Sequence, residues 1–312
     1  MSSSGDAAKC VAVVQARMFS NNAKSKPLLE VGGMPLLQCV LQNVHALRQV
    51  KEIVLAITQE PADDAFEQLP FVQAMLAQGK LRIFKGASLD VVRRLTDAVA
   101  AYEDQDCLLR FSVNHPFVHT SVTESIIKSH LDAGADYTAV DGLSFLCPEV
   151  FRVGALRVLN GMKDLSDFER EKVAVHFWNK NANFRSSILP KNFGGLDPSL
   201  EQYLFGTFQA KSDVDRLSEI VANCVRAELP SDCPYLPGTD MFPSVEAILE
   251  FAKKQLSDFR SATATTPSVM PGGTAVYSAS TANSSKEVRM AGVPVGPGYP
   301  CYIAAEIGQN HN

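Results

Sequence analysis

The stretch CVAVVQARMFSNNAKSKPLL, residues 10–29, decides the fold. It begins with an apolar run, continues as a polar loop that contains Arg17, Lys24 and Lys26, and leads into a helical pattern at residues 35–50. A strand that runs into a cationic loop and then a helix is how an open α/β sheet holds a phosphate-bearing ligand at its carboxyl edge. On charge alone a second interpretation stays open, in which this loop is exposed to solvent and its lysines bind no ligand.

Beyond this loop, apolar runs alternate with stretches of helical spacing. Strands are expected at 52–59, 81–84, 106–111 and 136–140, and helices at 62–78, 89–103 and 120–133. We expect Asp63 and Asp64 in the first turn of the helix at 62–78. This alternation predicts an α/β fold with a doubly wound, mostly parallel sheet. The second half is expected to complete the sheet, to add a small β-rich arm and a strand at 203–210, and to end in a helix at 244–259.

Composition limits the possible partners. The chain has 312 residues, 46% hydrophobic and 20% charged, with a net charge of −5. No dense basic stripe suggests nucleic acid, and no apolar run approaches the roughly 20 residues that span a bilayer. The start lacks the apolar core of a signal peptide. The seven cysteines are odd in number and contain no C-x-x-C, which favours reduced thiols in a cytoplasmic protein. We interpret Cys147 and the single tryptophan, Trp178, as packing residues.

The order of residues in the first loop resembles the signature of the sugar cytidylyltransferase family, in particular its spore-coat polysaccharide branch. The family pattern reads Q-A-R-M-G-S-x-R-L-P-G-K, and the chain keeps Gln15, Ala16, Arg17, Met18, Ser20 and Lys26. Later segments resemble family segments in the same order, at 56–64, 84–94, 110–116, 170–173 and 208–213. The resemblance implies a Rossmann-like fold of the nucleotide-diphospho-sugar transferase type. It also implies transfer of CMP from CTP to a sugar acid, release of pyrophosphate, and a homodimer.

The resemblance assigns catalytic contacts with the phosphates to Arg17 and Lys26. The implied nucleotide-binding set is Gln15, Ala16, Arg17, Ser20, Lys26, Asp90 and Arg110. Cations are needed there because negative charge crowds around the α-phosphate. The residues alone leave alternatives open. Asp90 and Arg94 have the i, i+4 spacing of a helix-stabilising pair, and Arg110, at a strand end, suits either a ligand or an ion pair.

The implied metal site departs from the family pattern. The family holds Mg²⁺ on two aspartates, and the chain has Asn114 and Gln209 at those positions. A neutral amide offers an oxygen but no charge to a hard dication. Asn22 replaces a phosphate-binding arginine, and Phe19 and Ser25 replace glycines. Two hypotheses therefore stand: a divergent enzyme whose use of Mg²⁺ is in doubt, or a pseudo-enzyme domain that serves as a dimerisation or scaffold module.

The C-terminal part has a different character. Residues 261–285 contain no charge and few large apolar side chains, which is typical of a flexible linker. AEIGQNHN, residues 305–312, resembles the opening A-E-I-G-x-N-H-x-G of the N-acetylneuraminate synthase family through Glu306, Asn310 and His311. We expect a cytidylyltransferase-like domain at 1–260, a linker at 261–298, and at 299–312 the first strand of a sialic acid synthase barrel, in a longer fusion. No residue identifies the sugar acid.

Overall fold

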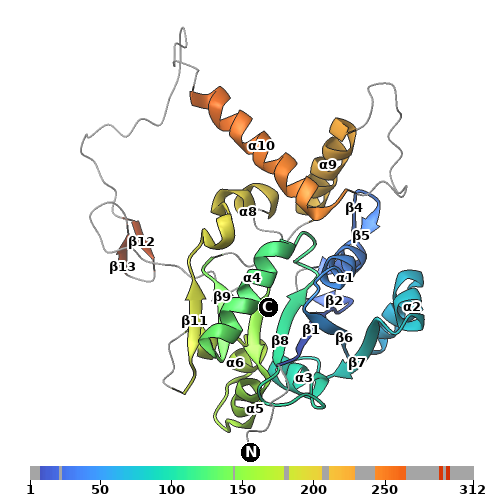
Figure 1. Ribbon diagram of the computed structural model, residues 1–312, viewed down its shortest axis with the longest axis vertical. Helices are drawn as coiled ribbons and strands as arrows, with labels where there is room; N and C mark the ends of the chain where they lie inside the picture. Colours follow the sequence, from blue (N-terminus) through green and yellow to red (C-terminus); the bar gives the residue numbers. More distant parts are fainter. Residues whose placement is uncertain are drawn as a thin grey trace, which may run out of the picture. The chain divides into compact units, whose positions relative to one another are not determined.

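The computed structural model describes residues 8–20, 23–142, 145–178, 183–205, 211–228, 243–264, 288–290 and 293–295. Contacts divide the chain into two units, Met1–Ser261 and Ala262–Asn312. The first unit contains the main sheet and the helices around it (Figure 1). None of the helices in the described ranges is long and apolar enough to cross a membrane.

The main sheet has seven strands in the order β11-β9-β10-β8-β1-β6-β7. Their bounds are Cys10–Gln15 (β1), Val50–Thr58 (β6), Leu81–Gly86 (β7), Cys107–Ser112 (β8), Tyr137–Val140 (β9), Glu149–Arg152 (β10) and Ser186–Leu189 (β11). Strand β1 runs parallel to β6 and β8, whereas β10 runs antiparallel to β8 and β9. The predicted doubly wound, mostly parallel sheet is confirmed.

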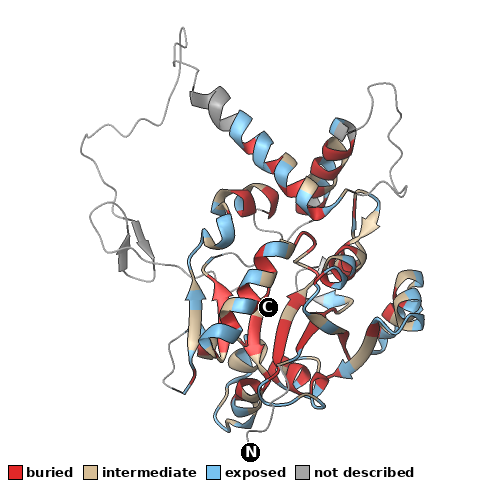
Figure 2. Cartoon of the chain, in the orientation of Figure 1, coloured by how far each residue is buried: buried red, intermediate tan, exposed pale blue. Residues whose placement is uncertain are grey.

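Helices cover both faces of this sheet, because the strand side chains alternate between two apolar cores. One core joins Ala12 and Val14 of β1 to side chains of α1 (Leu36–His45), α4 (Thr120–Ala133), α8 (Pro198–Phe205), α9 (Lys211–Glu228) and α10 (Val245–Ala264). The other joins Val11 and Val13 to α3 (Val91–Ala98), α5 (Val153–Gly161) and α7 (Val175–Trp178). The central strands are accordingly buried along most of their length (Figure 2).

Short elements complete the first unit. They are two ribbons, β2–β3 (Phe19–Ser20 with Ala23–Lys24) and β4–β5 (Glu30–Val31 with Met34–Pro35), the single turns η1 (Lys26–Leu28) and η3 (Phe193–Gly195), and η2 (Pro61–Gln68), α2 (Pro70–Ala77) and α6 (Asp167–Glu171). In the second unit, β12 (Val288–Met290) pairs antiparallel with β13 (Val293–Val295). Glu306, Asn310 and His311 lie outside the described residues, as does most of the predicted linker.

Two predicted elements differ from the structure. The helix predicted at 62–78 is split into η2 and α2, because Pro70 lacks an N–H and holds Leu69 in an extended conformation. The prediction of a strand at 203–210 is wrong for residues 203–205, which are the part of that range that the structure describes. Those residues end α8, which starts at Pro198 and buries Leu200 and Leu204 on one face.

The second half also departs from the expected β-rich arm. Its strands β10 and β11 join the main sheet, which confirms that this half completes the sheet, but its described residues form no separate β-rich arm. The described residues between and after them are mainly helical, in α5, α6, α7 and α8. The helix predicted at 244–259 is confirmed as α10.

Candidate functional site

The loop that follows β1 is fixed by a buried carboxylate. Asp63 is only 1% exposed and accepts three hydrogen bonds: from Met18 N–H at 2.7 Å, from Thr58 N–H at 3.0 Å and from the Thr58 hydroxyl at 2.6 Å. Thr58 ends β6, the strand beside β1. Asp63 therefore ties the cationic loop to the carboxyl end of the neighbouring strand, a role that the sequence analysis missed.

Ser25 gives this loop its tight turn. It has φ 55° and ψ 29°, and it is the non-glycine residue with positive φ among those described. Its N–H donates to Met18 O at 2.6 Å, so this donor closes the loop and does not point toward a ligand. A left-handed conformation at a residue with a Cβ costs roughly 1–2 kcal/mol, which explains why the family pattern has glycine at this position.

We expect Ser25→Gly to raise the free energy of unfolding by about 0.5–1 kcal/mol, because relief of the left-handed strain exceeds the added chain entropy of glycine. Urea denaturation of the full chain measures this change. Ser25→Ala is the matched control, since it removes the hydroxyl but keeps the Cβ, and it should give no gain. Equal effects of the two substitutions would contradict the strain assignment.

Positive charge gathers beside the loop. Burial lowers the pKa of Lys26 to about 8, against a smaller raising effect of the Asp213 charge. Arg94 is 4% exposed, and its Nη1 donates to Ala87 O at 2.8 Å and Ser88 O at 3.3 Å. Burial, and then the charges of Arg17 and Arg110, lower the pKa of Arg94 to about 10. Cations that are desolvated and mutually repelling at a strand edge favour a polyanionic ligand.

Asp90 is placed differently from the expected i, i+4 pair. Its Oδ1 accepts from Arg93 N–H at 2.9 Å and caps α3, while its Oδ2 pairs with Arg170 of α6 at 2.9 Å. Arg94 uses its guanidinium on the loop carbonyls instead. The pair suggested by the i, i+4 spacing is therefore wrong, and Asp90 joins two helices. A contact between Asp90 and a nucleotide stays a prediction.

Five side chains form a hydrogen-bonded polar row. Four lie on β1, β8, β10 and β9, which are consecutive neighbours in the sheet, and the fifth, Trp178, ends α7. Arg110 Nε donates to Gln15 Oε1 at 2.6 Å, and Arg110 Nη1 donates to Glu149 Oε2 at 2.8 Å. The Tyr137 hydroxyl donates to Glu149 Oε1 at 2.6 Å and accepts from Trp178 Nε1 at 2.8 Å. The row caps the apolar core on this face and brings together Gln15 and Arg110, whose predicted contact with a nucleotide stays a prediction.

Two cavities lie along the polar row. The larger has a volume of about 640 Å³ and is lined by row members and by Asn114, Asp141 and Phe145. The smaller, of about 260 Å³, shares Arg110 and Trp178 with it and adds Lys172. A cavity of several hundred Å³ lined by both polar and apolar side chains suits a small polar ligand. Trp178, expected as a packing residue, is 39% exposed and forms part of both walls.

The described residues do not fit a magnesium site. Asn114 Oδ1 is buried with no hydrogen-bond partner among the described residues, so it is an available oxygen, but a neutral one. Gln209 lies outside the described residues. Within the described ranges, no group of three or more His, Cys, Asp or Glu could hold a metal ion. Mg²⁺ prefers carboxylate oxygens, so the described residues would hold it poorly.

The remaining predicted residues fall around the same loop. Ala16 is buried, and its N–H donates to Ala56 O at 3.3 Å, so it continues the pairing of β1 with β6. Ser20 ends β2, and its side chain lies outside the described atoms, as does Asn22. Phe19, in place of a glycine, is 57% exposed and pairs with Lys24 in the ribbon.

A doubly wound sheet that carries a cationic loop and a ligand-sized cavity at one edge defines a nucleotide-binding class of α/β protein. The sequence model of the family described as cytidylyltransferase matches residues 11–258. The chain therefore belongs to the cytidylyltransferase family.

Other known proteins are similar to this chain in sequence or in fold. The spore coat polysaccharide biosynthesis protein SpsF of Bacillus subtilis is 27% identical over 191 residues, 58% of this chain and 75% of that protein. An uncharacterised protein of Methanocaldococcus jannaschii is 24% identical over 172 residues, 54% of this chain and 67% of the other. The structure of a cytidylyltransferase from Leptospira borgpetersenii matches 80% of this chain and 96% of its own with a TM-score of 0.62. At 18% identity, that match shows the fold alone.

Proposed function

We propose that the chain transfers CMP from CTP to a sugar acid and releases pyrophosphate. The observation that carries this proposal is the cluster of cations at the carboxyl edge, the partly buried Arg17 and Lys26 with the buried Arg94, together with a cavity of about 640 Å³. Family membership supports the cytidylyl donor and a sugar-like acceptor. The similarity to a spore coat polysaccharide protein supports a role in carbohydrate synthesis.

In this proposal, the loop cations bind the triphosphate and the cavity holds the acceptor. An acceptor hydroxyl oxygen bonds to the α-phosphorus, the bond from the α-phosphorus to the bridging oxygen breaks, pyrophosphate leaves, and the hydroxyl proton passes to solvent. Arg17 and Lys26 offset the charge that develops on the phosphate oxygens. Asp63 keeps the loop in place without contacting the reacting atoms.

The second candidate is a pseudo-enzyme domain that binds without reacting. Two observations favour it: Asn114 offers only a neutral oxygen where the family pattern has a carboxylate, and the Ser25 N–H is engaged within the loop. Such a domain would serve as a dimerisation or scaffold module. In this setting the synthase-like residues 305–312 would start a sialic acid synthase in cis, which sequencing of the transcript tests.

The experiment that separates the candidates uses the full chain, CTP and N-acetylneuraminic acid or 2-keto-3-deoxy-manno-octonic acid. Pyrophosphate release that needs both substrates supports the enzyme. CTP binding by calorimetry without release, with and without Mg²⁺, supports the pseudo-enzyme. If CTP binds no better than GTP or ATP, the cytidylyl assignment is wrong.

Lys26 makes nucleotide binding depend on pH. Its pKa of about 8 means that it is mostly charged at pH 7 and mostly neutral at pH 9. We therefore expect the affinity for CTP to fall about five- to tenfold over this interval, because an anion loses a cationic partner. Lys26→Arg should flatten the profile, since arginine stays charged. The exposed Lys51→Arg is the control and should leave the slope unchanged; a slope retained in Lys26→Arg would contradict the assignment.

We keep two further proposals for this protein. A homodimer is proposed from the resemblance alone and is tested by sedimentation velocity. A cytoplasmic location is supported by the cysteines in the described ranges, Cys10, Cys39, Cys107, Cys147 and Cys224, which are buried thiols that form no disulfide.

A further inference from the structure

Two of the three guanidinium nitrogens of Arg110 are held by hydrogen bonds within the polar row, and the third can bind a ligand. Its Nε and Nη1 are fixed by Gln15 and Glu149, at 2.6 and 2.8 Å. Its Nη2 has no hydrogen-bond partner among the described residues, although Arg110 lines both cavities. A guanidinium that is fixed by two atoms and presents a third to a cavity is well suited to bind an oxyanion.

Glu149 does not compete for that free nitrogen. Its Oε2 accepts from Arg110 and its Oε1 accepts from the Tyr137 hydroxyl, so both carboxylate oxygens are already engaged. Burial, and then the charge of Glu149, raise the pKa of Tyr137 far above its usual range, so this hydroxyl remains a donor. Tyr137 itself is fully buried and stacks on Phe177 with ring centroids 5.1 Å apart. The anchor of Arg110 is therefore rigid.

Trp178 completes the wall of the cavity. Its indole N–H is bound to the Tyr137 hydroxyl at 2.8 Å, which fixes the plane of the ring. The ring is 39% exposed and lines the same two cavities as Arg110. The indole face can pack against the apolar face of a sugar ring, and the fixed guanidinium beside it can bind an anion. Together they match a sugar ring that carries a carboxylate.

We propose that Arg110 selects the acceptor by binding its carboxylate through Nη2. Glu149 and Tyr137 are positioning residues that hold the Arg110 guanidinium in the orientation needed for this contact. The inference rests on the proposed function, because it names the group that distinguishes a sugar acid from a neutral sugar. Arg110 then contacts the substrate, whereas Glu149 and Tyr137 act only through it.

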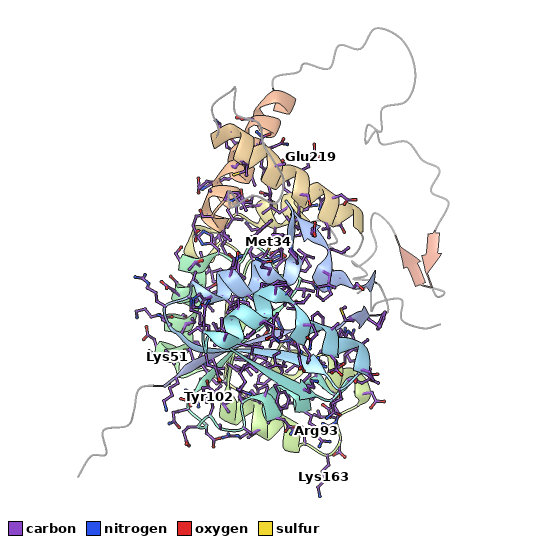
Figure 3. The ribbon with its side chains drawn as sticks, turned by 90° about the vertical axis from the view of Figure 1, so that its right-hand side faces the viewer. Met34, Lys51, Arg93, Tyr102, Lys163 and Glu219 are labelled. Atoms are coloured by element: carbon purple, nitrogen blue, oxygen red, sulfur yellow. The ribbon has the colours of Figure 1, made fainter. Side chains whose placement is uncertain are left out.

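The chain contains a matched triad that serves as a control. Arg82 Nε donates to Glu52 Oε1 at 2.9 Å, and the Tyr102 hydroxyl donates to Glu52 Oε2 at 2.8 Å. This Arg–Glu–Tyr set lies near the amino ends of β6 and β7, in the region where Figure 3 labels Lys51 and Tyr102. None of its members lines either cavity beside the polar row.

The test compares N-acetylneuraminic acid and 2-keto-3-deoxy-manno-octonic acid with their methyl esters, which lack the charge. Binding to the full chain is followed by calorimetry and by the fluorescence of Trp178, the single tryptophan. We expect at least one acid to bind tenfold or more tightly than its ester, because a charge-assisted hydrogen bond is lost in the ester. Arg110→Lys should reduce this preference to about twofold.

The positioning residues give the sharper readout. Glu149→Gln removes a negative charge beside Arg110, so simple neutralisation predicts tighter binding of the acid, whereas loss of positioning predicts binding about three- to tenfold weaker. We expect Glu149→Gln and Tyr137→Phe to bind the acid more weakly. In both variants the KM for the acid should rise, and the KM for CTP should change little. Glu52→Gln and Tyr102→Phe should leave the preference for the acid intact.

Three results would overturn the inference: no response to either acid, equal affinity for acid and ester, or tighter binding of the acid by Glu149→Gln. In each case CTP binding and pyrophosphate release are measured separately. Equal affinity for acid and ester together with CTP-dependent release would leave the proposed transferase standing and remove Arg110 as the selecting residue. Absence of both CTP binding and release would instead contradict the proposed function.

Discussion

Asp63→Ala is expected to lower the free energy of unfolding by about 3–5 kcal/mol and to abolish CTP binding. The substitution leaves Met18 N–H, Thr58 N–H and the Thr58 hydroxyl without their acceptor in a buried place. It also removes a negative charge that acts on the buried Arg94. Each unsatisfied buried donor costs about 1–3 kcal/mol, so the three together account for the expected loss.

Denaturant unfolding and calorimetry of CTP binding measure the two effects. The matched control is the neighbouring Asp64→Ala, because Asp64 is exposed and its ion pair among the described residues is with Lys85 at the surface. Its effect should stay within about 0.5 kcal/mol. Asp63→Asn should be intermediate, since an amide offers one acceptor oxygen where the carboxylate offers two. If Asp63→Ala loses CTP binding without losing stability, the carboxylate acts on the ligand and not on the loop.

The sequence predicted the central sheet because its signals are local. A near-continuous apolar run such as residues 53–57 is typical of a buried parallel strand, whatever it pairs with. The failures arose where a local pattern admits two structures. The short apolar run before residue 206 fits a strand or a buried helix, and the packing of Leu200, Leu204 and Phe205 against the core selects the helix.

Of the candidate site, only the cationic loop after β1 could be predicted from the sequence. Arg17 and Lys26 follow a strand in the sequence, so their position at the sheet edge could be inferred. The polar row could not, since Arg110 bonds to Gln15 across 95 residues and to Glu149 across 39. Asp63 was identified as a carboxylate of a first turn, although its partner Met18 lies 45 residues away. Such contacts depend on strand order, which no local pattern contains.

Asn114→Asp is expected to make CTP binding depend on magnesium. In the natural chain Asn114 offers a buried oxygen without a partner, and a carboxylate there would add the charge that a hard dication requires. We expect the variant to bind CTP at least tenfold more tightly with Mg²⁺ than with a chelator, a difference of about 1.4 kcal/mol. The natural chain should show less than about a threefold difference.

Without Mg²⁺, the new carboxylate should instead lower the melting temperature of the variant, because a buried charge then lacks a partner. Addition of Mg²⁺ should restore it. Asn192→Asp, which adds the same charge at an exposed position, is the control and should show neither effect. If the natural chain already binds CTP in a strongly Mg²⁺-dependent way, then the amide oxygen suffices, and the enzyme is favoured over the pseudo-enzyme. If only the variant does, the fold retains a nucleotide site whose metal ligand was lost at this residue.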